Sequence, residues 1–161
     1  MIELMRRGYL DVVQVIYNLF EQEPAAELLP TAAETGTGVI VRVVFDEGVL
    51  TGKYNKGHHF PDDDFRGRYF AGDRLDRAID RVDQIRTDVA EAGLSDQYTP
   101  ADVALKFALA HPAMSTVIPG IRSPRQAELN TAVSEKPDLP QPLLTRLRRH
   151  RWLRGVWYGG K

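Results

Sequence analysis

The sequence predicts an α/β fold in which parallel strands alternate with helices. Three short apolar runs rich in β-branched residues, at 12–17, 39–45 and 115–118, have the composition of strands buried in a parallel sheet. Segments with the apolar spacing of helices separate these runs, and such alternation favours a parallel sheet with right-handed crossovers. Ligands of such sheets bind beyond the carboxyl ends of the strands, so the residues after each run are candidates for a functional site.

The first third of the chain predicts the end of a helix followed by one βαβ unit. Residues 1–9 carry Ile2, Met5 and Tyr9 at helical spacing, ahead of the first strand. Between the first two strands, residues 24–35 have the same spacing and predict a second helix, which ends at Gly36. A strand, a helix and a strand of this combined length match one βαβ unit.

The middle of the chain predicts a long loop and then two helices. Residues 46–73 are dense in Gly, Asp, Asn and Pro, and a loop this long is usually functional. Charged residues separate apolar ones at helical spacing over 75–89, which predicts an amphipathic helix. Thr99 and Asp102 have the spacing of a capping box, with Pro100 at the first helical position, so a second helix is expected there.

The carboxyl-terminal part predicts one strand and two more helices. The strand at 115–118 ends at Pro119-Gly120, and Ser123 has the position of a helix cap. A last helix is expected to begin at Pro142 and to turn Leu147 and Trp152 inward.

The composition excludes several classes of protein. The 161 residues include 21 basic and 22 acidic ones, so the formal charge of −1 does not favour nucleic acid or an acidic membrane as a partner. The absence of cysteine excludes disulfides and thiolate metal sites and suits a cytoplasmic protein. No apolar run reaches the ~18 residues of a membrane helix, and residues 1–7 do not have the pattern of a signal peptide.

The segment after the third strand has the features of an anion site. Gly120 lets the backbone turn closely, and Ser123 caps a helix whose first amides are unpaired donors at the positive end of a dipole. Arg122 adds a cation in the same turn, which suits a phosphate. On this local pattern alone, an ordinary strand-to-helix turn with a good cap is an equal alternative.

Three segments resemble the aldo-keto reductase family. Residues 117–130, from Val117-Ile118-Pro119-Gly120-Ile121-Arg122-Ser123-Pro124 to Asn130, resemble the segment with which these enzymes hold the 2′-phosphate end of NADPH. Residues 38–54, ending in Asp46-Glu47-Gly48-Val49-Leu50-Thr51-Gly52-Lys53-Tyr54, resemble the strand-seven loop of the family, and residues 13–18 resemble its sixth strand. The three matches occur in the family's order and cover nearly the whole chain.

The resemblance implies that residues 1–161 form the carboxyl-terminal half of a barrel, with 46–73 as a cofactor and active-site loop. The expected fold is a partial (β/α)8 TIM barrel with about three parallel strands and surrounding helices, because a closed barrel takes about 250 residues. Such a fragment leaves two sheet edges and the barrel-facing surface open to water. We therefore expect a second copy, or a companion chain that carries the first barrel half, as a partner.

The resemblance also implies a set of cofactor-binding residues. Gln14 is similar to the residue whose amide meets the nicotinamide carboxamide, and Lys53 resembles the lysine that reaches the pyrophosphate. Arg42 stands where many members place an aromatic ring, Val43-Val44-Phe45 replaces the commoner Ser-Pro-Leu, and Leu129 replaces a usual glutamate. The implied NADPH-binding residues are Gln14, Arg42, Phe45, Asp46, Lys53, Gly120, Arg122, Ser123, Gln126 and Asn130.

The implied activity is carbonyl reduction by hydride transfer from NADPH to an aldehyde or ketone. The family's catalytic aspartate, tyrosine, lysine and histidine belong to the first four strands, so the resemblance assigns no catalytic residue here and predicts inactivity for the chain alone. The alternative is a non-catalytic nucleotide-binding or assembly module.

Other candidate sites have simpler interpretations. His58, His59 and residues 62–64 offer metal ligands, but their spacing favours a solvated loop, so no metal site is predicted. His111 is expected to be structural, at a helix end where a cation favours the dipole, and His150 is expected to be exposed. Tyr17 lacks a nearby lysine and is interpreted as a barrel or pocket-wall residue.

The last helix is rich in arginine and could bind RNA or lipid, but a surface helix that packs its Leu and Trp side chains inward is the favoured interpretation. The residues concerned are Arg146, Arg148, Arg149, Arg151, Arg154, Trp152, Trp157 and Tyr158.

Overall fold

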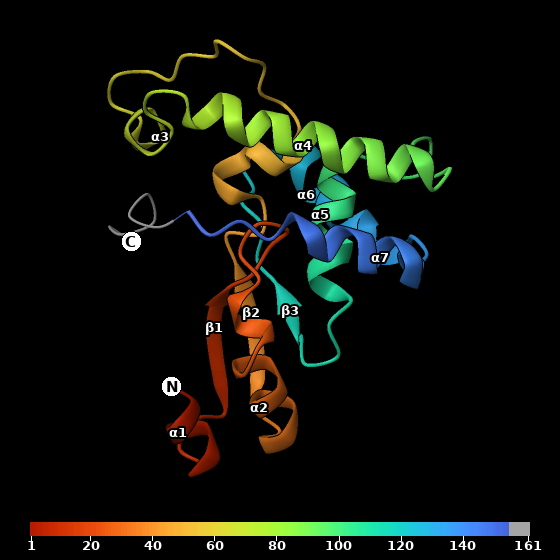
Figure 1. The fold of residues 1–161 in the computed structure, drawn as a ribbon. Coiled ribbons are helices and arrows are strands. Elements are labelled where there is room, and N and C mark those ends of the chain that lie inside the picture. Colours follow the sequence, from red (N-terminus) through yellow and green to blue (C-terminus); the bar gives the residue numbers. More distant parts are fainter. Residues whose placement is uncertain (155–161) are drawn as a thin grey trace.

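The computed structural model describes residues 1–154, and these form the predicted α/β architecture (Figure 1). Strands β1 (Val12–Ile16), β2 (Gly38–Arg42) and β3 (Thr116–Val117) make one parallel sheet in that order. In the register of the sheet, Val13 lies beside Val39 and Val41 lies beside Val117. The prediction of a three-stranded parallel sheet is confirmed.

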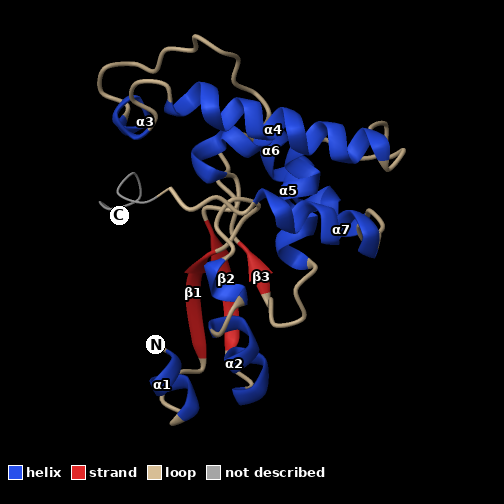
Figure 2. Cartoon of the chain, viewed as in Figure 1, coloured by secondary structure: helices blue, strands red, loops and turns tan. Residues whose placement is uncertain are grey.

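Helices surround the sheet unevenly. The α-helices are α1 (Ile2–Arg6), α2 (Leu28–Thr35), α3 (Phe65–Tyr69), α4 (Arg74–Glu91), α5 (Pro100–Leu109), α6 (Pro124–Ala132) and α7 (Gln141–Leu147). Short 3-10 helices are η1 (Glu23–Ala25), η2 (Asp46–Thr51), η3 (Val133–Glu135) and η4 (Arg148–His150). Figure 2 shows α4 to α7 gathered toward the carboxyl ends of the strands, with α1 toward the opposite end. No helix within residues 1–154 is long and apolar enough to cross a membrane.

The predicted caps set the starts of two helices. Thr99 and Asp102 form a reciprocal capping box at the start of α5, and the Ser123 hydroxyl accepts a hydrogen bond from the Gln126 amide at the start of α6. Gly36 ends α2 with a left-handed φ of 69°. These ends depend on residues at most four positions apart, which is why the sequence alone reveals them.

The sheet is buried on one face only, which corrects the expectation of strands buried on both. Val13, Val15, Val39 and Val41 are buried, whereas Val12, on the other face, is 52% exposed. Successive side chains of a strand point to opposite faces, so the burial alternates along β1. The open face is the barrel-facing surface of the predicted partial barrel.

Several predicted boundaries shift. The second strand ends at Arg42 rather than 45, because Val43 has a φ of 55° and a left-handed residue cannot continue a strand. The third strand is shorter than 115–118, and the helix over 24–35 is divided into η1 and α2. The loop at 46–73 contains η2 and α3.

The hydrophobic core lies between the covered sheet face and the helices. Helix α4 buries the apolar stripe predicted for it, from Leu75 to Val89, and α5 buries Phe107. Trp152 is buried with its ring edge-on to Phe20, at 5.6 Å between centroids, which confirms that this tryptophan packs inward. Tyr9, expected on a helical apolar face, is 70% exposed because α1 ends at Arg6.

Candidate functional site

A cavity of about 570 Å³ lies beyond the carboxyl ends of β2 and β3. Its walls come from the turn after β2, the first residues of α5, the loop after β3 and helix α6. The cavity is lined by Phe45, Lys53, Gly120, Arg122, Gln126 and Asn130 among the residues that the sequence singled out. The fold therefore brings together residues from the two segments that were separately assigned to cofactor binding.

The turn after β2 has an unusual backbone. Val43, Asp46 and Glu47 have φ values of 55°, 45° and 56°, in a region that residues other than glycine rarely adopt. Each such residue costs roughly 1–3 kcal/mol, and strained backbone of this kind clusters at functional sites. Surrounding structure must compensate for this cost, so contacts from other segments are expected to hold the turn in place.

Gly48 lets the Lys53 side chain fold back over the turn. A Cβ atom at Gly48 would lie 3.2 Å from both Cε and Nζ of Lys53, tighter than an ordinary contact, and the glycine has a φ of 95°. The Lys53 ammonium also lies 4.9 Å from the centroid of the Tyr54 ring. The turn therefore holds this cation beside the cavity.

The opposite wall of the cavity is formed by Arg122 and by one side of α6, with Gln126, Leu129 and Asn130. Besides the Ser123 cap, the Gln126 side chain accepts a hydrogen bond of 2.6 Å from the Arg122 amide, which orders the residues before the helix. Asn130 also lines the cavity, and its side-chain nitrogen is buried without a hydrogen-bond partner in the described part of the chain. An uncompensated buried donor costs free energy, which marks this position for attention.

Arg66 is a cavity residue that sequence reasoning missed. It lies in the long loop, where its guanidinium binds both carboxylate oxygens of Asp64 and donates to the Tyr54 hydroxyl at 2.8 Å. The hydrogen bond from Arg66 holds the pKa of the Asp64 carboxyl far below its usual range. An aspartate two positions before an arginine, Asp64-Phe65-Arg66, is the sequence signal that points to this cap and ion pair.

Lys136 is a second unpredicted cation of the cavity wall. Its ammonium donates to Asp102 Oδ2 and to the Gln97 carbonyl, both at 2.8 Å. Burial raises the pKa of Asp102, but hydrogen bonds from Lys136 and Thr99 outweigh it and hold that pKa below its ordinary value. Lys53, Arg66, Arg122 and Lys136 outnumber the cavity's acidic residues, Glu47 and Asp102, which suits a multiply charged anion.

Four of the predicted cofactor residues do not line the cavity. Gln14 and Arg42 lie on β1 and β2, and Ser123 acts as the cap of α6. Asp46 has a fully buried carboxylate that accepts from the Tyr69 hydroxyl at 3.0 Å and from Arg154 at 2.7 Å. In the described chain, Asp46 therefore binds protein groups from two other segments.

The candidates that were set aside occupy structural positions. Tyr17 is buried, its ring stacks on Phe107 at 5.8 Å, and burial raises its pKa. His58 packs against the Tyr54 ring, and no cluster of three metal-ligating side chains occurs within residues 1–154.

Two histidines differ from expectation. His150 is buried rather than exposed, because its Nε2 is 2.8 Å from Asp88 Oδ2 on α4. His111 is structural, as predicted, but not as a cation. Its Nδ1 accepts a hydrogen bond from the Ala113 amide, and burial, with Arg148 nearby, lowers its pKa.

The arginine-rich end of the chain is largely committed to ion pairs. Arg146 pairs with Glu91, Arg151 pairs with Glu23, and Arg154 is buried, which agrees with the structural interpretation of this segment. Trp157 and Tyr158 lie outside the described residues.

Comparison with known proteins identifies the family. The profile described as the aldo/keto reductase family matches residues 3–151. A D-threo-aldose 1-dehydrogenase of Pseudomonas sp is 32% identical over 128 residues, which cover 78% of this chain and 35% of the relative. A pyridoxal 4-dehydrogenase of Microbacterium luteolum is 29% identical over 132 residues, covering 82% of this chain and 34% of the relative. The chain thus spans about a third of the length of these curated relatives.

Solved structures agree on the fold. The glycerol dehydrogenase of Gluconobacter oxydans superposes with a TM-score of 0.75 at 20% identity, over 89% of this chain and 43% of that one. This neighbour is a (β/α)8 barrel, so the three strands and their helices correspond to part of such a barrel. The profile covers most of the chain, and the chain belongs to the aldo/keto reductase family.

Proposed function

We propose that this chain is the NADPH-binding half of an aldo-keto reductase and that the cavity beyond β2 and β3 holds the cofactor. The observation that carries the proposal is the convergence of Lys53 and Arg122, from segments far apart in the sequence, on one cavity with an unpartnered Asn130 amide. A dinucleotide with three phosphate groups fits this donor set, because phosphates are recognised by cations and helix amino termini.

Each wall has a separate role in this proposal. Lys53, folded over Gly48, pairs with the pyrophosphate, while Arg122 binds the 2′-phosphate. Gln126 orders the Arg122 backbone, and Asn130 lines the adenosine end. When bound, NADPH supplies a hydride for the carbonyl carbon of an aldehyde or ketone. The proton for the carbonyl oxygen comes, in this proposal, from a tyrosine of the first barrel half.

The open sheet face supports a partner that completes the barrel. Val12 is half-exposed and Gln14 is exposed on this face, and β1 pairs on one side only among the described strands. Unpaired strand edges and exposed apolar side chains favour association. We propose that the first barrel half, in a companion segment or chain, or failing that a second copy, covers this face. The absence of cysteine makes the reducing cytosol the proposed compartment.

Calorimetric titration with NADPH and NADH tests the proposed function. The purified chain is expected to bind NADPH saturably. Arg122→Ala is expected to weaken NADPH binding by about tenfold or more and to change NADH binding little, because the lost contact is to the 2′-phosphate. Arg125→Ala is the matched control, since Arg125 lies three positions further on, in the first turn of α6, is exposed and does not line the cavity.

Two outcomes would contradict the proposal. A folded chain that binds neither nucleotide would point to an assembly module, and equal effects of Arg122→Ala and Arg125→Ala would remove Arg122 from the site. Light scattering of the same sample tests the partner: a mass of two chains supports a second copy, whereas a single chain points to a companion.

A further inference from the structure

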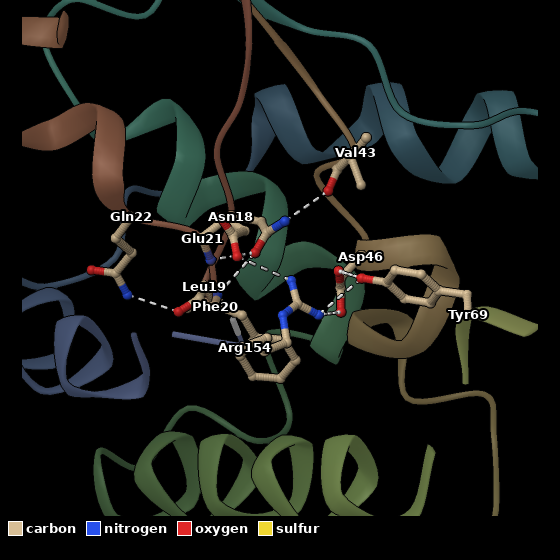
Figure 3. Close-up of polar contacts among 9 residues, drawn as sticks. All are labelled: Asn18, Leu19, Phe20, Glu21, Gln22, Val43, Asp46, Tyr69 and Arg154. Atoms are coloured by element: carbon tan, nitrogen blue, oxygen red, sulfur yellow. Dashed lines mark hydrogen bonds and ion pairs between the residues drawn. The ribbon is translucent and has the colours of Figure 1, made fainter. Parts of the chain in front are cut away.

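Arg154 is far along the chain from the turn after β2, yet it binds this turn, which forms part of the cavity wall. Its guanidinium is fully buried, and Nη1 donates to Asp46 Oδ2 at 2.7 Å and to the Tyr69 hydroxyl at 3.0 Å. Nη2 lies 3.4 Å from a carboxylate oxygen of Glu21. Figure 3 shows the guanidinium between the Asp46 carboxylate and the turn that follows β1.

Residues 151–154, here called the carboxyl-terminal strap, are held at further points. The Trp152 amide donates to the Phe20 carbonyl at 2.9 Å, and the Arg154 guanidinium lies 5.8 Å from the centroid of the Phe20 ring. Arg151 pairs with Glu23 at the surface. The strap is thus anchored along the turn after β1, and Arg154 extends from it to the turn after β2.

Asp46 is the point where this contact reaches the strained backbone. It has a φ of 45°, Glu47 has a φ of 56°, and Gly48 follows, against which the Lys53 side chain lies. The carboxylate is held from two sides, by Tyr69 on Oδ1 and by Arg154 on Oδ2. At the other end of the turn, the Asn18 side chain donates to the Val43 carbonyl at 2.9 Å. Protein groups therefore hold both ends of a backbone that is unfavourable by itself.

Overall stability is a weak explanation for this buried ion pair. A buried pair loses the hydration of both charges, and apolar residues that fill the same space are often as stabilising. Buried polar groups can instead select one backbone conformation, and here the pair is attached to three left-handed residues in one turn. The position of the Asp46–Arg154 pair at this turn therefore suggests a role in fixing the conformation of the turn rather than in overall stability.

We propose that Arg154 is a positioning residue for Lys53: through Asp46 it holds the turn after β2 in the left-handed conformation that keeps the Lys53 ammonium at the cavity. This inference rests on the proposed function, because it concerns the contact of Lys53 with the cofactor pyrophosphate. Arg154 itself does not line the cavity.

A pair of ligands separates positioning from general stability. NADPH reaches both walls of the cavity, whereas adenosine 2′-monophosphate lacks the pyrophosphate and reaches only the α6 wall. Arg154→Met is expected to weaken NADPH binding by about tenfold or more, because the turn that carries Lys53 loses the buried partner of Asp46. The affinity for adenosine 2′-monophosphate should stay within about twofold of the wild-type value. Arg151→Met is the matched control, because it removes a cation from the same strap but not from Asp46.

The dependence on Lys53 gives a second readout. If Arg154 acts through Lys53, the losses of NADPH binding free energy caused by Lys53→Met and by Arg154→Met do not add in the double variant. Circular dichroism reports whether each variant is folded. If Arg154→Met does not fold, Asp46→Asn, which keeps the shape of the side chain and removes its charge, replaces it in both titrations and in the double variant with Lys53→Met.

Each result is decisive. Equal losses for the two ligands, no loss for either, or additive losses with Lys53→Met would overturn the positioning role and leave the proposed function standing. A folded wild-type chain that binds neither ligand would overturn the proposed function and this inference together. A loss of affinity for NADPH but not for adenosine 2′-monophosphate, which does not add to the loss from Lys53→Met, supports the positioning role.

Discussion

His150 Nε2 lies 2.8 Å from Asp88 Oδ2, and this contact joins the end of the last helical segment to the last turn of α4. Both side chains are largely buried, with the guanidinium of Arg149 at 3.5 Å from the other oxygen of Asp88. Arg146 lies 3.9 Å from the same oxygen as Arg149, so the carboxylate has one buried partner and two nearer the surface. His150, which is buried, and Arg149, whose side chain is 70% exposed, provide a comparison of a buried and a surface contact.

We expect His150→Ala to lower the free energy of unfolding by about 2 kcal/mol or more, because it leaves a buried carboxylate without its closest partner. Arg149→Ala should cost at most about 1 kcal/mol, as surface pairs do. Urea unfolding measures both values. Equal losses would contradict the assignment of His150 as the structural partner of Asp88.

The ion pair of Asp102 and Lys136 predicts that the stability of the folded state falls at acid pH. The pKa of Asp102 is held below its ordinary value, so its ionised form stabilises the folded state at neutral pH, and this contribution disappears as the pH falls through the folded pKa. Asp102→Asn should therefore be less stable than the wild type at pH 7, with a difference that shrinks below about pH 4. Urea unfolding from pH 7 to pH 3 measures it. The exposed Asp96→Asn serves as control, and a constant difference for Asp102→Asn would refute the prediction.

His111 also predicts a loss of stability as the pH falls, and this loss begins at a higher pH than the loss expected from Asp102. Its pKa is lowered in the folded state, so the unfolded chain takes up the proton first as the pH falls, and this favours unfolding. The effect should begin below about pH 6.5, the ordinary histidine value. His111→Asn keeps a side-chain acceptor for the Ala113 amide and should flatten the curve between pH 6.5 and about 5. Thermal unfolding in a pH series tests this, with the exposed His59→Asn as control. An unchanged slope in His111→Asn would contradict the assignment.

The left-handed backbone at Glu47 predicts a stabilising substitution. Glycine adopts this conformation without the steric cost of a Cβ atom, so Glu47→Gly should raise the free energy of unfolding by about 1 kcal/mol. Glu47→Ala removes the same charge but keeps the Cβ atom, and it should give no such gain. Chemical unfolding of both variants separates backbone strain from charge, and an equal effect in the two would attribute it to the charge instead.

The sequence by itself predicted the features that depend on near neighbours. The apolar runs at 12–17 and 39–45 identified two strands, although the second ends at Arg42. The Thr99 and Ser123 caps were predicted because a cap and its partner amide are three residues apart. Gly120, Arg122 and Gln126 were assigned to one cofactor-binding segment, and Lys53 to another, by their resemblance to the family. That both segments line one cavity follows from parallel strands, whose carboxyl ends meet at one edge.

Only the tertiary structure decided which polar groups are buried and with what they pair. Asp46 was assigned to the cofactor by resemblance, but the fold pairs it with Arg154, 108 residues away. His150 was expected to be exposed, and a partner 62 residues away buries it. Val43 has a strand-forming side chain and yet a left-handed φ, because the fold requires a turn at that point. Local propensities amount to about 1 kcal/mol per residue or less, so long-range packing overrides them wherever it contributes more.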